Sequence, residues 1–169
     1  MDSKNTKASY ISKGGLFTAF GVICIYLSTL LPVNKLYLLA IASCIIPLSV
    51  ITTNVKNALI IYAATSALSL LICGFKIPVI LYIIFFGLYG TIKYYVEKMR
   101  KIYLELLLKL VFFNIVMFSM LIIYKLFFPN VLKLNISIYF IIIGAQFAFL
   151  IYDYVLTLFI NVINKKFNF

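Results

Sequence analysis

The sequence predicts an all-α fold, namely a polytopic integral membrane protein with six transmembrane helices and both termini in the cytoplasm. Three observations support this class. The 169 residues are 65% hydrophobic and only 11% charged, whereas soluble domains hold about 45–50% apolar and about 25% charged residues. The apolar residues form runs long enough for helices to cross a hydrocarbon core of about 30 Å. These runs do not alternate in polarity as the strands of a membrane barrel do.

Six apolar segments follow one another along the chain, and we expect each to be a membrane-spanning helix. They cover residues 14–31, 36–53, 58–73, 77–92, 104–128 and 136–160. The breaks between them are short and contain turn-forming or charged residues, as expected where a chain returns to the membrane interface. We therefore expect a single membrane domain over residues 1–169. We interpret the first segment as a retained helix and not as a cleaved signal peptide.

The basic residues set the expected orientation. Placing the N-terminus in the cytoplasm puts 11 of the 15 lysines and arginines on or near the inner side, in line with the positive-inside rule. The densest group lies in an expected basic cytoplasmic loop at 93–103, which separates four spans from two. We assign the net charge of +11 to topology and lipid headgroups. No nucleic-acid partner is expected.

Polar residues inside the last two spans are candidate functional residues, because polar groups are costly in lipid. Asp153 is the only carboxylate well inside a predicted span, and Gln146 lies on the same helical face. Asn114 and Lys125 are similarly aligned on the fifth span. These residues either line a cavity or form interhelical hydrogen bonds, with Lys125 reaching the outer interface. Asp153 either pairs with a lysine of a neighbouring helix or binds a cation or proton during transport.

Two local spacings complete the pattern. Gly15 and Ala19 form a small-x-x-x-small pair on the first span. Such a face lets helix backbones approach closely, and it either packs within the bundle or docks a separate membrane partner. Glu105 and Lys109 are four residues apart at the inner end of the fifth span, where we expect them to form an ion pair.

Enzymatic chemistry is poorly supported by this composition. The chain contains no histidine, and no serine or cysteine has a plausible activating partner. No glycine-rich loop with a lysine is present to hold nucleotide phosphates. We therefore expect no catalytic residues, no cofactor and no metal site. Any energy input would come from an ion gradient or from another subunit.

Three short stretches carry a resemblance to a known family. They are Ser12–Leu16, Leu31–Leu36 and Phe86–Gly90. Together with the size, the six spans and the inward termini, they resemble the substrate-binding S components of energy-coupling factor (ECF) transporters. The resemblance implies a subunit of the bacterial cytoplasmic membrane that captures a vitamin-like micronutrient outside. It also implies association with a transmembrane coupling subunit and two cytoplasmic ATPases, which Gly15 and Ala19 would help to dock.

The resemblance further implies a ligand site near the outer face, among loops and the later helices. The candidate substrate-binding residues are Asn34, Lys35, Lys76, Asn114, Lys125, Asn130, Asn135 and Gln146. The expected function is therefore that of the substrate-binding subunit of a micronutrient importer. Two alternatives stay open, a non-transporting membrane scaffold or assembly protein and an ion-coupled carrier that uses Asp153.

Overall fold

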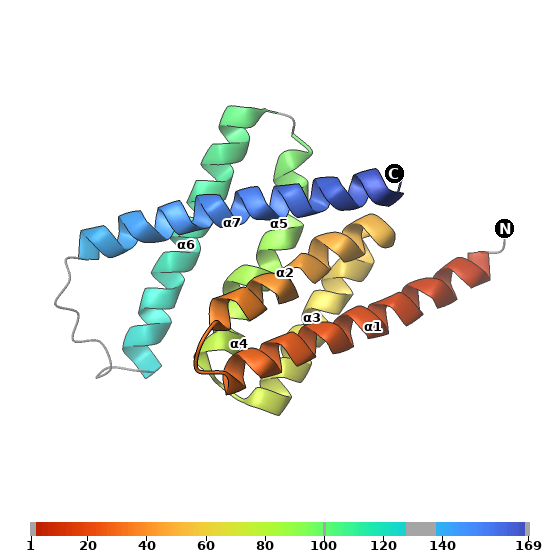
Figure 1. The fold of residues 1–169 in the computed structure, drawn as a ribbon, viewed down its shortest axis with the longest axis horizontal. Coiled ribbons are helices and arrows are strands. Elements are labelled where there is room, and N and C mark those ends of the chain that lie inside the picture. The colour runs from red at the N-terminus through yellow and green to blue at the C-terminus, as the bar shows by residue number, and fades with distance from the viewer. Residues whose placement is uncertain (1–2, 100, 128–137, 168–169) are drawn as a thin grey trace. The chain divides into compact units, whose positions relative to one another are not determined.

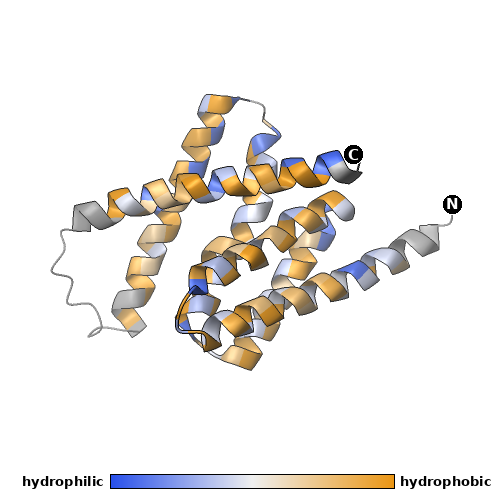
Figure 2. Cartoon of the chain, viewed as in Figure 1, coloured by the Kyte–Doolittle hydropathy of each residue, from blue (hydrophilic) through white to orange (hydrophobic). Residues whose placement is uncertain are grey.

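The computed structural model describes residues 3–99, 101–127 and 138–167, and these residues form helices and no strands. The helices, labelled in Figure 1, are α1 (Ser3–Leu30), α2 (Lys35–Thr52), α3 (Val55–Cys73), α4 (Ile77–Leu81), the π-helix η1 (Tyr82–Phe86), α5 (Gly87–Glu97), α6 (Ile102–Phe127) and α7 (Ile138–Phe167). Because α4, η1 and α5 run on as one helical segment, the described residues contain six spans long and apolar enough to cross a membrane. Figure 2 shows the hydrophobic residues along all of them. The predicted all-α class and number of apolar spans are confirmed for this part of the chain.

One difference from the sequence-based boundaries is the start of α1, at Ser3 and not at residue 14, and another lies at the expected basic loop, 93–103. Helix α5 continues through the first half of that loop to Glu97, and α6 begins at Ile102. The extension has a physical basis, because buried positions recur every three or four residues at Tyr89, Lys93 and Val96. Lys93 is therefore a fully buried helical residue and not a loop lysine.

Two compact units make up the chain. The first unit comprises Met1–Tyr95 with Phe159–Phe169, and the second comprises Val96–Leu158. The sequence led us to expect a single membrane domain. Each unit is described below by itself.

The core of the first unit lies where α1 packs against α2 and α3. Its buried residues are Ile45, Ile46 and Val50 of α2 with Ala58 and Ile61 of α3, and Phe17, Val55 and Tyr62 pack around them. These side chains are aliphatic or aromatic and recur at helical spacing, so each helix presents one continuous face to its neighbours.

Two glycines allow the segment after α4 to approach α2 and α3 closely. A Cβ atom added at Gly87 would lie 2.5 Å from the ring of Tyr62 on α3, and one added at Gly90 would lie 2.8 Å from Pro47 on α2. Real side chains do not approach so closely. The absence of a side chain at these positions therefore sets how near the helices lie.

The π-helix η1 is held to α3 by a side chain. The N–H of Gly87 donates to the carbonyl oxygen of Tyr82, five residues back, which is the π pattern. The hydroxyl of Tyr62 donates to the carbonyl oxygen of Ile83 at 2.8 Å. On the same helix Thr65 and Ser69 are also buried, so α3 presents a polar face at this point.

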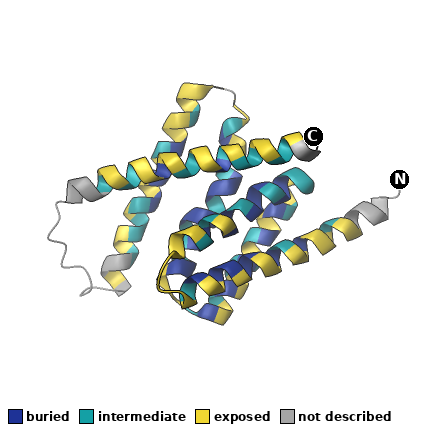
Figure 3. Ribbon diagram, viewed as in Figure 1, coloured by how far each residue is buried: buried dark blue, intermediate teal, exposed yellow. Residues whose placement is uncertain are grey.

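The second unit contains α6, the larger part of α7 and the last residues of α5. Side chains pair in reverse order along α6 and α7, since Lys109 contacts Asp153 and Phe113 contacts Phe149. The two helices therefore run in opposite senses at the point where they cross, as Figure 1 shows. Figure 3 shows long exposed faces on both of them, and most exposed residues there are apolar. Such faces suit contact with lipid.

Candidate functional site

One buried lysine gathers three carboxylates in the second unit. The ammonium of Lys109 lies 2.7 Å from Glu105 Oε1, 3.0 Å from Asp153 Oδ2 and 3.1 Å from Glu97 Oε1. Lys109 is only 4% exposed. An ammonium has three N–H donors, so each donor can serve one carboxylate. These four residues are called the Lys109 cluster below.

The helices explain how the Lys109 cluster forms. Glu105 stands one turn before Lys109 on α6, as the sequence predicted, and that ion pair is confirmed. Asp153 comes from α7, and the expectation that it pairs with a lysine of a neighbouring helix is also confirmed. Glu97 is the last residue of α5. Three of the four acidic residues of the whole chain thus meet at one ammonium.

An aromatic layer follows the Lys109 cluster along α6 and α7. Phe113, four residues after Lys109, stacks on Phe149, four residues before Asp153, with ring centroids 4.5 Å apart and an angle of 11° between the planes. Both rings are buried. Stacked phenylalanines exclude water, and low polarity strengthens the neighbouring ion pairs.

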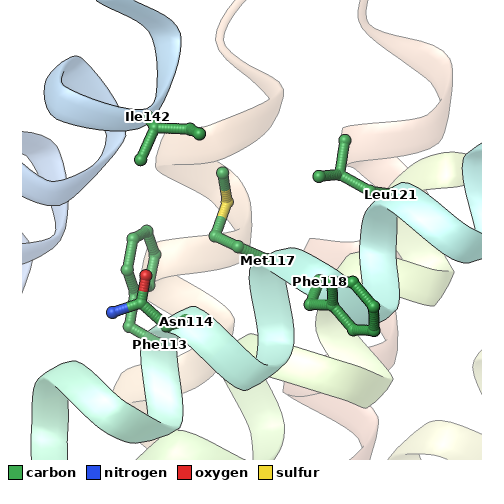
Figure 4. Close-up of a pocket in the computed structure, with 6 residues that line it drawn as sticks. All are labelled: Phe113, Asn114, Met117, Phe118, Leu121 and Ile142. Carbon is green, nitrogen blue, oxygen red and sulfur yellow. The ribbon is translucent and has the colours of Figure 1, made fainter. Parts of the chain in front are cut away.

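Beyond the aromatic layer lies a cavity of about 170 Å³. It is lined by Phe113, Asn114, Met117, Phe118 and Leu121 of α6 with Ile142 of α7, as Figure 4 shows. Asn114 is the single polar residue among them. Its Nδ2 donates to the carbonyl oxygen of Leu110 at 2.8 Å. The cavity opens at the surface of the unit, where Phe118 and Leu121 are exposed. It is called the α6 cavity below.

The other sequence-predicted binding residues that the structure describes are absent from the lining of the α6 cavity. Asn34 and Lys76 occupy the positions just before α2 and α4, and Lys35 is the first residue of α2. All three are exposed. Gln146 is half-buried on α7 and is absent from the cavity lining. Asn130 and Asn135 lie outside the described residues, as does the side chain of Lys125.

The small-residue pair on α1 lies on an open face. Gly15 and Ala19 are both exposed, and a Cβ atom added at Gly15 would meet no heavy atom within 4 Å. The neighbouring Gly14 and Thr18 are buried. Helix α1 therefore turns one small-residue face toward its own unit and leaves the Gly15–Ala19 face free of contacts among the described residues.

Sequence reasoning missed Glu97 and the apolar lining of the cavity. Glu97 was assigned to a loop, although its spacing of four residues from Lys93 would have placed both on one face of a longer helix. Met117, Phe118 and Ile142 gave no signal, because apolar residues inside a span are the rule. They can be recognised as cavity residues only once the structure shows α6 lying against α7.

Three features of the described residues determine the chemistry available to this chain. They provide a buried ammonium with three carboxylates, a stacked phenylalanine pair and a cavity with one carboxamide. Among the described residues, no group of three or more Cys, Asp or Glu side chains is arranged to hold a metal ion. No family model matches the chain, and neither a curated protein nor a solved structure matches it.

Proposed function

We propose that this chain is the small-molecule-binding subunit of a membrane importer, an S-component-like protein of the bacterial cytoplasmic membrane with both termini inside. It captures a vitamin-like molecule from the outer face and delivers it together with a partner coupling module. The α6 cavity is the observation that carries this proposal, because the exposed side chain of Asn114 lines a small, otherwise apolar pocket midway along a membrane-length helix.

The depth of the α6 cavity fits a transport role. Asn114 stands 12 residues after Ile102, the start of α6, which corresponds to about 18 Å along the helix axis. That depth is close to the centre of a hydrocarbon core of about 30 Å. Transporters commonly bind their substrates near the bilayer midplane, between helices.

The open face of α1 supports a partner. A helix face with Gly15 and Ala19 offers a second helix a close approach of backbones, and no described residue of this chain covers it. The sequence holds no phosphate-binding loop of its own, so a subunit that binds a nucleotide would supply the energy for release.

Mass spectrometry of the gently purified protein tests the central claim. The full chain, extracted in mild detergent and released in the gas phase, should carry a retained small molecule at a stoichiometry near one. A variant with Met117→Trp fills the α6 cavity and should lose that molecule, while Ile115→Trp adds the same bulk on a part of α6 that does not line the cavity. Retention by both variants, or by neither, contradicts the proposal.

The partner is tested through the open face of α1. Gly15→Phe should abolish recovery of a coupling subunit and its ATPases when the tagged chain is purified from its native membrane. Leu71→Phe places similar bulk at an exposed position on α3 and should leave recovery unchanged. Equal recovery with both variants would mean that this face of α1 docks nothing.

The Lys109 cluster favours a second candidate, an ion-coupled carrier. Three carboxylates meet at Lys109, inside a span, and intramembrane carboxylates frequently form proton or cation relays. In liposomes that contain this chain alone, such a carrier would take up substrate along a proton gradient and lose that activity with Asp153→Asn. Uptake that requires a partner favours the importer subunit. A complete absence of ligand and uptake favours a membrane scaffold.

A further inference from the structure

The α6 cavity also indicates what kind of molecule it accepts, and this step rests on the proposed function only in taking the cavity to be a binding site. Its volume of about 170 Å³ is the first restriction. An apolar protein cavity of about 150 Å³ is large enough for benzene. The α6 cavity therefore has room for a single six-membered ring with one small substituent.

The lining restricts the ligand further. Phe113 and Phe118 offer aromatic rings, and Met117 offers a thioether that packs well against ring edges. No charged residue lines the cavity. Because an unpaired charge is strongly disfavoured in an apolar site, the ligand is neutral.

Asn114 supplies the one polar contact. Only the amide nitrogen can donate to a carbonyl, so the hydrogen bond from Nδ2 to Leu110 fixes the orientation of the carboxamide. Its Oδ1 atom remains as an acceptor, and Figure 4 shows it directed toward the side of the cavity where Ile142 lies. An acceptor at this depth in lipid is best satisfied by a hydrogen-bond donor.

We propose that the α6 cavity binds a neutral molecule built on one aromatic ring with one hydrogen-bond donor, and that this donor bonds to Oδ1 of Asn114. Phenols and aromatic amines or amides belong to this class. The ring lies among Phe113, Met117 and Phe118. A lipid acyl chain fits the apolar lining but carries no donor for Asn114.

Three fluorinated probes test the class on the full chain in lipid nanodiscs. The ¹⁹F NMR signals of 4-fluorophenol, 4-fluorotoluene and 4-fluorobenzoate report binding, with empty nanodiscs as the measure of partition into lipid. 4-Fluorophenol should bind saturably and about tenfold more tightly than 4-fluorotoluene, which corresponds to one hydrogen bond. 4-Fluorobenzoate should not bind. Equal binding of the phenol and the toluene overturns the role of Asn114.

Three variants test whether the probes bind in the α6 cavity. Asn114→Leu should lower the affinity for 4-fluorophenol about tenfold, to that of 4-fluorotoluene. Met117→Trp should abolish binding of both probes, and Ile115→Trp should leave it unchanged. Circular dichroism establishes that each variant is helical. Binding that survives Met117→Trp would show that the probes partition into lipid and that the cavity does not hold them.

The two proposals fail in different ways. A charged or multi-ring molecule found on the purified protein would contradict the ligand class and leave the importer function standing. Specific binding of 4-fluorophenol with no retained molecule and no partner-dependent uptake would contradict the importer function and leave the ligand class standing.

Discussion

The two units of this chain hold their helices together by different means. In the first unit the helices pack closely against one another. Gly87 and Gly90 leave room for side chains of α3 and α2, and the hydroxyl of Tyr62 donates to a backbone carbonyl of η1. In the second unit one ammonium joins carboxylates from α5, α6 and α7, followed by one stacked ring pair.

The difference shows two solutions to the same problem. Inside lipid there is no hydrophobic force between helices, so association depends on close packing or on polar contacts. Close packing spreads the stabilisation over many small contacts. The Lys109 cluster concentrates it in one side chain. Single substitutions should therefore have larger effects in the second unit, and the predictions below test that contrast from the largest effect to the smallest.

Replacement of Lys109 by methionine should have the largest effect. It leaves three carboxylates close together and without their shared ammonium, and removal of one partner from a buried ion pair costs about 3–5 kcal/mol. Because the chain has no tryptophan, the free energy of unfolding is best followed by far-UV circular dichroism during titration with sodium dodecyl sulfate.

Two further variants serve as controls for Lys109→Met. Lys98→Met removes an exposed lysine in the turn after α5 and should change the stability by less than about 0.5 kcal/mol. Adding Glu105→Gln and Asp153→Asn to Lys109→Met should restore part of the loss, because fewer negative charges are then held close together without Lys109. A Lys109→Met protein as stable as Lys98→Met would contradict the importance of the cluster.

Gly87→Ala should have the next largest effect, this time in the first unit. Its added methyl group would lie 2.5 Å from the ring of Tyr62, and forcing extra atoms into a packed site costs about 1–3 kcal/mol. Gly144→Ala is the matched control, because a Cβ atom there meets no heavy atom within 4 Å. In a helix this second change should stabilise by about 0.5–1 kcal/mol. The same unfolding titration should give opposite signs for the two variants, and equal signs would refute the packing argument.

A smaller effect is expected for Tyr62→Phe, which removes the hydroxyl that donates to Ile83. Loss of one such hydrogen bond lowers the free energy of unfolding by about 0.5–1.5 kcal/mol. Hydrogen exchange of the η1 amides should also become faster. Tyr37 is 72% exposed, so Tyr37→Phe should leave both measurements unchanged. If both phenylalanine variants behave alike, the contact with η1 contributes nothing.

The smallest effect should come from Ser69→Ala. Ser69 is 0% exposed, and its hydroxyl has no hydrogen-bond partner among the described residues, so its removal should be nearly neutral or slightly stabilising. Ser28 is equally buried but donates to Ile25 at 2.7 Å. Ser28→Ala should therefore cost about 1 kcal/mol. A larger loss for Ser69→Ala than for Ser28→Ala would indicate a bound partner at Ser69.

The sequence was sufficient for features that depend on composition and local spacing. Apolar runs predicted all six spans, and the expected break between residues 73 and 77 correctly separates the third from the fourth. The pair of Glu105 with Lys109 followed from helical geometry alone. These predictions succeeded because they need only the residues within one or two turns.

Features that depend on helix pairing could not be predicted in the same way. That Asp153 meets Lys109, 44 residues away, follows from the crossing of α6 with α7, which no local pattern specifies. Charge was also a misleading guide at Lys93, which looked like a loop residue and is buried in α5. The α6 cavity contains one residue predicted as a candidate, Asn114, among five apolar neighbours that gave no signal.

The π-helix η1 determines how α5, which follows it, would respond to the loss of one residue. A π turn contains one residue more than an α turn, so deletion of one residue within Tyr82–Phe86 would let the segment close as a regular α-helix. Because one wide turn is then replaced by one narrower turn, the later positions of α5 would keep nearly the same direction around the helix axis. Lys93 and Val96 would stay on the buried face, whereas deletion of one residue between Gly87 and Ile92, in regular α-helix, would rotate them away from it by about 100°. The π turn thus absorbs one residue without changing which side of the helix carries charge.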